Sequence, residues 1–275
     1  MARLTAVVLV IVLTVLTQIG GAILLVAWLI GRLIFPKALK GWRRAGLLTL
    51  LFLGLYAAIS IFVVPPLAAR AGRVPLPCRA EPERPFAAGS VIYCALNRHY
   101  VAPELVTLLT ELSRALDRAF PGTTTLFLDG NFPFFNGFPQ LPHLSHSDGR
   151  KLDLAYFYAD PNGSYLPATL RSPIGYWAFE QPVAGDASPC GAQSWLSLRW
   201  NLAVLQDKWP DRPLEPSRTK AALQWLVSEG VRFKVERIFI EPCLAARLGV
   251  SSDVLGFQGC RAARHDDHIH VQIRR

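Results

Sequence analysis

Two long apolar segments in the first quarter of the chain constrain the fold more than any other feature. Residues 4–31 include no charged side chain, and residues 45–64 form a second uncharged stretch that ends at Pro65. A helix of about 20 apolar residues spans the hydrocarbon core of a bilayer. The sequence therefore predicts two transmembrane helices within residues 1–66, which together form a membrane anchor.

The basic residues of this anchor predict its orientation. Five of its six basic residues lie in the connection 32–44, and the sixth is Arg3. Because cytoplasmic loops carry the excess of Lys and Arg, the connection is predicted to be cytoplasmic and both chain ends to lie on the opposite side. A cleaved signal peptide is the alternative, but its apolar region is only about 7–15 residues long. We expect the anchor to lie in a bacterial inner membrane and residues 67–275 to lie in the periplasm or an equivalent extracytoplasmic space.

The distribution of charge argues against a nucleic-acid partner. The chain carries a net charge of +9, but its first 66 residues contain six basic and no acidic residues, so residues 67–275 carry only +3. A surface that binds DNA or RNA needs clustered positive charge. The predicted partners are therefore the membrane, through the anchor, and a ligand of the exported part that is not a nucleic acid.

All five cysteines lie in the part of the chain that is predicted to be exported, where disulfides form and persist. None of them belongs to a C-x-x-C pair, which is the spacing of redox and many zinc sites. Proximity in the sequence favours the pairs Cys78–Cys94 and Cys243–Cys260, which leaves Cys190 unpaired.

Hydrophobic periodicity predicts an α+β domain after a Pro-rich tether at residues 67–86. Apolar residues recur at helical spacing over 102–120, and further helices are predicted over 194–209 and 217–230, the last with Ser217 as its N-cap. Four strands are predicted, over residues 123–128, 151–158, 233–240 and 268–273. The sheet is predicted to be mainly antiparallel, because parallel neighbours would need a crossover helix between each pair.

Five of the six histidines fall in two short segments, residues 143–153 and 265–270. On a strand, His268 and His270 share one face of the sheet, because successive side chains alternate between faces. Asp153 lies between two leucines of a predicted strand, so its carboxylate points away from the leucine layer. A carboxylate inside a strand is costly unless it is paired or bound to a cation.

Two imidazoles and one carboxylate, with a fourth position left for water, form the ligand set of catalytic zinc sites. The candidates are His146, Asp153 and His270. A lone histidine seven residues before an aspartate is nearly uninformative, and an H-x-H pair on a strand is moderately specific. The combination of the two segments predicts a metal site.

The two segments together resemble a known family. The pattern H-x-S-H-x-x-G-x-x-x-D from His143 to Asp153, followed downstream by H-D-D-H-x-H-V from His265 to Val271, is similar to that of the penicillin-insensitive murein endopeptidases. These enzymes belong to a wider group with lysostaphin-type and D-alanyl-D-alanine peptidases and the hedgehog signalling domain, which share a zinc-bearing antiparallel sheet. The resemblance covers about residues 102–275.

The resemblance implies that His146, Asp153 and His270 hold Zn²⁺ and that His143 borders the substrate cleft. The substrate that it implies is the stem peptide or cross-link of peptidoglycan, cleaved at a peptide bond by a zinc-activated water. Two departures from the family are the membrane anchor and a loop over residues 129–145 that contains four phenylalanines. This loop is interpreted either as core packing or as a lid or wall contact.

Three further residues lie where the chemistry needs an acid or a base. Asp267 stands three residues before the last ligand, where dipeptidase and carboxypeptidase relatives place a catalytic glutamate, and His265 and His268 are implied to lie beside the metal. Asp267 or His265 would take the proton from the attacking water, while His268 would stabilise the oxyanion or orient the ligands. Which of the three is the base stays open.

Two other classes of function compete with a zinc peptidase. The first is a membrane-anchored domain that binds zinc without catalysis and serves as a wall-binding or scaffold module, with other wall enzymes as partners. The second is a structural membrane protein whose histidines are incidental. Zinc content separates the second class from the others, and cleavage of peptidoglycan fragments separates the enzyme from the binding module.

Overall fold

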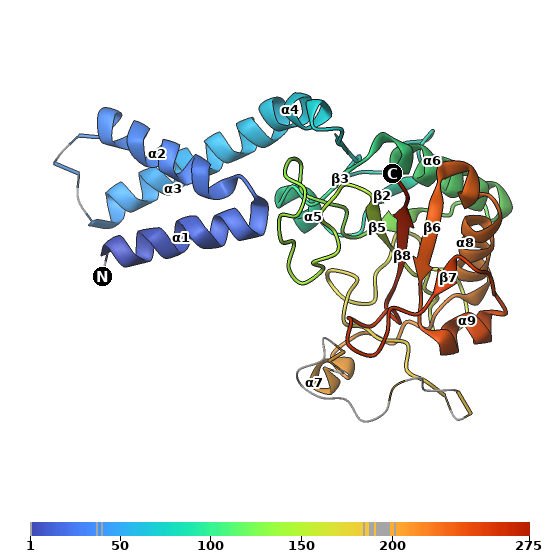
Figure 1. Cartoon of the computed structure of the whole chain (residues 1–275). Coiled ribbons are helices and arrows are strands. Elements are labelled where there is room, and N and C mark those ends of the chain that lie inside the picture. Colours follow the sequence, from blue (N-terminus) through green and yellow to red (C-terminus); the bar gives the residue numbers. More distant parts are fainter. Residues whose placement is uncertain are drawn as a thin grey trace.

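The structure is a computed structural model of the chain in which a bundle of apolar helices packs beside an α+β domain (Figure 1). The described residues are 2–36, 38–39, 41–183, 185–186, 190, 199–200 and 202–275.

The N-terminal part contains two short helices and one long one, which lie side by side in Figure 1. They are α1 (Ala2–Thr17), α2 (Gly20–Ile34), and a continuous helix composed of α3 (Gly41–Ala58), the π-helical turn η1 (Ile59–Val63) and α4 (Val64–Arg70). The long helix, Gly41–Arg70, is long and apolar enough to cross a membrane, and within the described residues it alone meets both criteria. The prediction of one continuous helix over residues 4–31 is therefore wrong.

The break between α1 and α2 has a local cause. Gln18 adopts a left-handed conformation with φ of +67°, which reverses the chain direction. Glycine lets the two helices approach closely, because a Cβ atom on Gly21 would lie 2.0 Å from Thr14 Oγ1. As a result, the start of α1 lies at the same end of the bundle as the connection between α2 and α3 (Figure 1), and not at the opposite end as the sequence predicted.

The domain contains a six-stranded sheet of order β2-β4-β5-β8-β6-β7. Its strands are β2 (Phe86–Ala88), β4 (Thr125–Phe127), β5 (Lys151–Ala155), β8 (His268–Ile273), β6 (Val235–Phe239) and β7 (Leu255–Gly256). The three central pairings are antiparallel, and the pairings of β2 with β4 and of β6 with β7 at the edges are parallel. The α+β prediction is confirmed, and the sheet is mixed around an antiparallel centre.

Apolar side chains fill one face of this sheet. Leu152 and Leu154 of β5 and Ile269 and Val271 of β8 are buried in the main core cluster, together with residues of α6 and α8. These helices cover that face and are α6 (Pro103–Ala119) and α8 (Pro216–Ser228), the latter followed by the 3₁₀ helix η2 (Gly230–Phe233). The alternation of strand residues then directs Asp153, His268 and His270 to the other face.

Two helix predictions need correction. Of the helix predicted over residues 194–209, residues 194–198 and 201 lie outside the described residues, and in the rest only α7 (Ala203–Gln206) is helical. The N-cap of α8 is Glu215 and not Ser217, because the Glu215 carboxylate accepts a hydrogen bond from Arg218 N at 2.7 Å. The other short helices are α5 (Val91–Ala95) and α9 (Pro242–Leu248).

Residues 67–86, expected to be a tether, are part of the folded domain. The long helix continues to Arg70, and the side chains of Arg73 and Leu76 are buried. Between them, β1 (Val74–Pro75) pairs with β3 (Tyr100–Val101) in a separate two-stranded sheet. The long apolar helix is therefore joined to the domain by a short, packed connection.

Of the two predicted disulfides, one is confirmed and one is wrong. Cys78 is bonded to Cys94, as proximity suggested. Cys260 is bonded to Cys190, which is 70 residues away in the sequence, and Cys243 is unpaired. Cys243 lies on α9 and is buried, so its thiol packs in the interior.

Candidate metal centre

Strand pairing places two of the predicted ligands opposite each other. Asp153 of β5 and His270 of β8 are direct partners in the antiparallel register. Their side chains are buried, and His270 Nδ1 lies 2.8 Å from Asp153 Oδ1. Cross-strand partners on one face lie close enough for their side chains to meet. The predicted site is therefore built on the two central strands.

The third predicted ligand, His146, comes from the loop that precedes β5. Its Nε2 atom lies 3.1 Å from His270 Nδ1 and 3.2 Å from Asp153 Oδ1. Its other nitrogen, Nδ1, donates a hydrogen bond to Gly130 O at 2.7 Å. A backbone carbonyl that accepts from one ring nitrogen fixes the tautomer and leaves the lone pair of the other free for a metal. The lone pair of His146 Nε2 thus faces the other two ligands.

His143, predicted to border the cleft, lies next to Asp153 and lines both cavities described below. Its Nδ1 atom lies 3.2 Å from Asp153 Oδ2 and 3.1 Å from Asp129 Oδ2. The ligand atoms of His143, His146 and Asp153 lie within 4.8 Å of one another, and these residues form a group that can hold a metal ion. The predicted metal site is thus confirmed only as a group that could hold a metal ion, in which Asp153 is shared between two adjacent sets of imidazoles.

The donor atoms fit a tetrahedral metal. For ligands at 2.0–2.1 Å, the edge of a tetrahedron is about 3.3 Å. The atoms His146 Nε2, Asp153 Oδ1 and His270 Nδ1 are separated by 2.8–3.2 Å. In addition, His265 Nδ1 is buried and has no hydrogen-bond partner among the described residues. Clustered imidazoles around one buried carboxylate are the chemistry that a divalent cation satisfies.

Burial and charge perturb the protonation of the site in the absence of a metal. Burial raises the pKa of Asp153, but the imidazole of His146 and its neighbours hold that pKa well below its usual range. Burial lowers the pKa of His143, and its contacts with Asp129 and Asp153 overcome this and raise it to about 10. Burial lowers the pKa of His270 to about 4. Metal binding to such a site competes with protons.

Asp267 and His268 form a hydrogen-bonded pair. His268 Nδ1 lies 2.5 Å from Asp267 Oδ1, and His268 Nε2 lies 3.6 Å from Asp153 Oδ2. Burial lowers the pKa of His268, and the carboxylates of Asp153 and Asp267 raise it above its usual value. Asp267 Oδ2 accepts a second hydrogen bond, from Trp177 N at 2.6 Å. Both oxygens of Asp267 are therefore engaged, and it orients His268.

His265 is the third member of the predicted group, and it is held through its backbone. Its N–H donates to Glu241 Oε1 at 3.1 Å, and its carbonyl accepts from the Tyr156 hydroxyl at 2.9 Å. Arg199 anchors Glu241 through two hydrogen bonds of 3.0 and 2.9 Å. Burial and the nearby His268 lower the pKa of His265 well below its usual range, so its imidazole is neutral.

Three residues of the site were missed in the sequence. Asp129 accepts from His143 and also pairs with Arg98, whose Nε and Nη2 atoms lie 2.6 and 2.5 Å from its oxygens. Tyr176 donates to Asp153 Oδ2 at 2.6 Å. The position of Asp129 at the end of a predicted strand was a usable signal. Tyr176 lies in a Pro- and Gly-rich segment without periodicity and offered none.

A buried arginine holds the loop that carries the histidines. The guanidinium of Arg73 donates to Phe132 O, to Asn136 Oδ1 at 2.5 Å and to Ser147 O at 3.3 Å. These acceptors bracket His143 and His146 in the sequence. A buried charge without a carboxylate contact is stable only when its hydrogen bonds are satisfied. Arg73 therefore fixes both ends of the loop from the end of the membrane helix.

The site opens into two neighbouring cavities. The larger, of about 190 Å³, is lined by six of the seven predicted site residues. Asp267 lines the smaller cavity of about 70 Å³, which shares His143 and His268 with the first. The side chains of Trp177 and Trp200 form part of the wall of the smaller cavity. Trp177 is left-handed, with φ of +66°, a conformation that such a residue adopts only when its surroundings enforce it.

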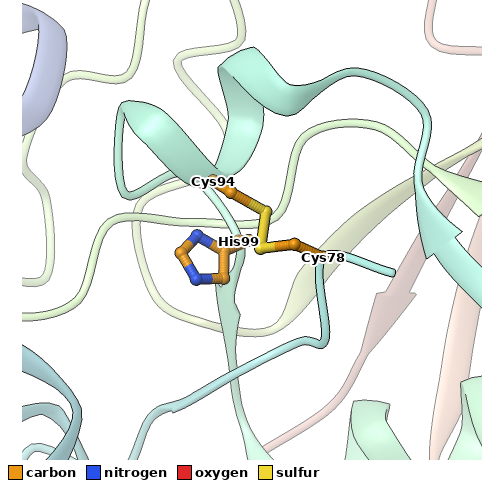
Figure 2. Close-up of side chains that lie close together, drawn as sticks. All are labelled: Cys78, Cys94 and His99. Atoms are coloured by element: carbon orange, nitrogen blue, oxygen red, sulfur yellow. A yellow bond between two sulfur atoms is a disulfide. The ribbon is translucent and has the colours of Figure 1, made fainter. Parts of the chain in front are cut away.

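A second group of ligand-type residues lies near β3 and consists of Cys78, Cys94 and His99 (Figure 2). The figure shows the disulfide between the two cysteines beside the imidazole ring. A metal binds the thiolate form of cysteine. Because both sulfurs are used in the disulfide, this group is a covalent staple and the candidate metal centre is the one on β5 and β8.

Comparison with protein-family models and with curated protein sequences finds no match to this chain. The functional argument therefore depends on the motifs of the sequence and on the geometry of the site.

Proposed function

We propose that the domain after the membrane anchor is a zinc metallopeptidase that hydrolyses peptide bonds in the stem peptides or cross-links of peptidoglycan. The observation that carries this proposal is the cluster of His146, Asp153 and His270, whose donor atoms are 2.8–3.2 Å apart. Beside this cluster lies a further histidine, His268, which is oriented by the carboxylate of Asp267. The resemblance of both motifs to murein endopeptidases supports the choice of substrate.

The choice of His270 over His143 as third ligand follows from geometry. His270 Nδ1 lies within 3.1 Å of both His146 Nε2 and Asp153 Oδ1. His143 Nδ1 lies on the other carboxylate oxygen of Asp153 and is also bonded to Asp129. His143 is thus assigned to the wall of the substrate cleft, where it faces both cavities.

The Asp267–His268 pair supplies the acid and base. Bound zinc acts as a Lewis acid toward a water molecule and a peptide carbonyl. In the neutral imidazole, His268 Nδ1–H would donate to Asp267 and Nε2 would accept the proton of the attacking water, while Asp267 would stabilise the imidazolium that forms. His268 then delivers this proton to the nitrogen of the leaving amine. His265 is neutral and lines the cavity, where it can hydrogen-bond to the substrate.

The proposed location follows from the long apolar helix. Gly41–Arg70 would cross the inner membrane, with the basic connection 32–44 in the cytoplasm and the domain in the periplasm. A peptidase fixed there can reach the polymer next to the membrane, and other wall enzymes are its candidate partners.

The proposal is tested with the full chain purified in detergent. We expect about one zinc per chain by elemental analysis, lost in His146→Ala, Asp153→Ala and His270→Ala and retained in His143→Ala. Cross-linked muropeptides are incubated with each protein, and the products are identified by mass spectrometry. Loss of zinc in His143→Ala with retention in His270→Ala would reverse the ligand assignment. A zinc-loaded protein that cleaves neither cross-linked nor monomeric peptides would instead support the non-catalytic wall-binding or scaffold module.

A further inference from the structure

The membrane anchor and the domain are joined by hydrogen bonds in addition to the covalent connection at Arg73. The bonds run from Phe134 N to Gln18 Oε1 (2.9 Å), from the Tyr56 hydroxyl to Ala95 O (2.8 Å) and from Asn97 Nδ2 to Ser60 Oγ (3.1 Å). Figure 1 shows the turn between α1 and α2 next to α5 and the loop after β4. The domain therefore packs against the anchor, and the chain at Arg73 is not its sole connection to the anchor.

These contacts lie at a depth where the anchor is still apolar. Tyr56 and Ser60 precede Val64, the last residue of the uncharged stretch, by eight and four residues. At 1.5 Å per residue these positions are about 12 and 6 Å inside that end of the stretch. Between Ser60 and Val64, the side chains of Ile61 and Phe62 are 63% and 74% exposed, which suits contact with lipid. The parts of the domain that bond to Tyr56 and Ser60 therefore lie at the level of the bilayer surface.

The same parts of the domain carry exposed apolar side chains. Val91 and Ile92, one helical turn before Ala95 on α5, are 79% and 40% exposed. Phe135, which follows the bonded Phe134, is 66% exposed. Burial of one large apolar side chain is worth about 1.5–3 kcal/mol, so a bilayer beside these residues is a favourable environment.

We propose that Val91, Ile92 and Phe135 form a face that inserts into the outer surface of the bilayer. The occupant is lipid, because both segments of the face adjoin the apolar helices. Ala95 and Asn97, which follow Val91 and Ile92, bond to Tyr56 and Ser60, and Phe134, which precedes Phe135, bonds to Gln18. The proposal rests on the membrane location given under the proposed function. It places the loop that carries His143 and His146 at the bilayer surface, within reach of peptide substrates that are close to the membrane.

The test uses the full chain in phospholipid nanodiscs with one nitroxide label at a time. Four of the five cysteines are in disulfides and Cys243 is buried, so a new surface cysteine can be labelled selectively. The test sites are Phe135→Cys and Val91→Cys. Matched controls are Leu50→Cys on α3 and Val231→Cys on η2, which replace apolar side chains that are 67% and 57% exposed. Collision rates with oxygen, which concentrates in lipid, and with a water-soluble nickel chelate are measured for each label.

We expect the labels at positions 135, 91 and 50 to favour oxygen over the chelate by several-fold relative to the label at 231. If the label at position 50 reports lipid while the labels at 135 and 91 behave like the label at 231, the membrane location stands and the proposal of an inserted face is wrong. A face that is covered by a protein partner in the cell, and not by lipid, would give this result. If 50 also reports water, the membrane location itself fails, and the inserted face with it. The readout needs no enzymatic activity, so it does not depend on the assignment of substrate.

Discussion

At the scale of single residues, the contacts of the Asp267 carboxylate predict which tautomer His268, the proposed base, adopts. One of its oxygens faces His268 Nδ1 and the other accepts from Trp177 N. In Asp267→Asn, the amide can keep the bond to Trp177 only by turning its NH₂ group toward His268, which selects the tautomer with the proton on Nε2. We expect zinc content to be unchanged and the peptidase rate to fall by about 10²–10⁴-fold.

The readouts for Asp267→Asn are elemental analysis and the initial rate of muropeptide cleavage as a function of pH. A matched variant is Asp266→Asn, because the Asp266 carboxylate pairs with Arg264 and, within the described part of the chain, makes no hydrogen bond or ion pair with the imidazoles of the candidate metal site. Equal rates for wild type and Asp267→Asn would show that His268 needs no orientation by Asp267, and would return the role of base to His265.

His99 predicts how stability depends on pH. Burial lowers its pKa in the folded protein to about 4, from 6.5 in the unfolded chain. Between these two pKa values the imidazole of His99 binds more protons in the unfolded chain than in the folded one. The contribution of His99 to the free energy of unfolding is therefore fully present above pH 6.5 and is lost as the pH falls. From pH 7 to pH 5 this one residue should remove about 2 kcal/mol. In His99→Phe the shape of the ring is kept and this loss should disappear.

The measurement is thermal unfolding of both proteins at pH 7 and pH 5 with a chelator present, so that metal binding does not contribute. The fall in Tm between the two values should be smaller for His99→Phe than for wild type. His99 is suited to this test because its ring packs on Tyr100 and the Cys78–Cys94 disulfide, away from the metal centre. An equal fall in both proteins would mean that His99 is protonated in the folded state.

The site was more predictable than its supports. His143, His146, Asp153, His265 and His268 were found because the types and spacings of ligands are local in the sequence, and they line one cavity in the structure. Asp129 and Tyr176 complete the hydrogen bonds of the site from distant positions. Their selection depends on how the chain folds back on itself, which no local pattern encodes.

At the scale of elements, the predictions that hold are those that a strong period supports. Apolar spacing gave the helix Pro103–Ala119, and alternation gave β5 and β8 with their histidines and aspartate on one face. The break at Gln18 was missed because an apolar run has the same composition in one helix or two. Its only local signals are Gln18 itself and the glycines at 20 and 21, and close helix packing made them decisive.

The loop from Phe132 to Ser147 is an element that depends on Arg73. Replacement of Arg73 by Met keeps most of its volume and removes the bonds to Phe132 O, Asn136 Oδ1 and Ser147 O. The loop that carries His146 should then loosen, and the Kd for zinc should rise by about tenfold or more, as for other residues that orient metal ligands.

Competition with a zinc-binding dye measures this Kd. Arg84→Gln is the control, because Arg84 forms an exposed pair with Glu81, and such pairs contribute about 0–1 kcal/mol. A lower Tm for Arg73→Met with an unchanged Kd would show that Arg73 supports the fold and does not position the metal ligands.

At the scale of the whole molecule, the apolar helices and the α+β domain support the candidate metal site together. The long helix leads into Arg73, which holds the metal loop, and the turn at Gln18 touches the same loop at Phe134. A soluble fragment that begins at residue 67 lacks Gln18 and most of the long helix. Such a fragment therefore lacks the contact of Gln18 with the loop at Phe134 as well as the anchor, so the site should be studied in the full chain.

The arrangement of the bundle predicts the location of the N-terminus. The start of α1 lies at the same end of the bundle as the end of α2 and the start of α3 (Figure 1). In the sequence, the six basic residues of the first 66 lie at position 3 and between positions 32 and 44. The helices α1 and α2, of 16 and 15 residues, are about 24 and 22 Å long, enough to traverse most of the hydrocarbon core. From the distribution of positive charge in the sequence, we predict that this end is cytoplasmic.

A single cysteine at position 2 distinguishes this arrangement from an anchor of two spanning helices. With both α1 and α2 crossing, Ala2→Cys should resist a membrane-impermeant maleimide in intact spheroplasts and react after permeabilisation, whereas Val231→Cys should react in both. An anchor in which residues 4–31 form one helix would expose position 2 to the reagent from outside. Protection at position 2 would require the chain to turn back between residues 4 and 31, and Gln18 is where the structure makes that turn.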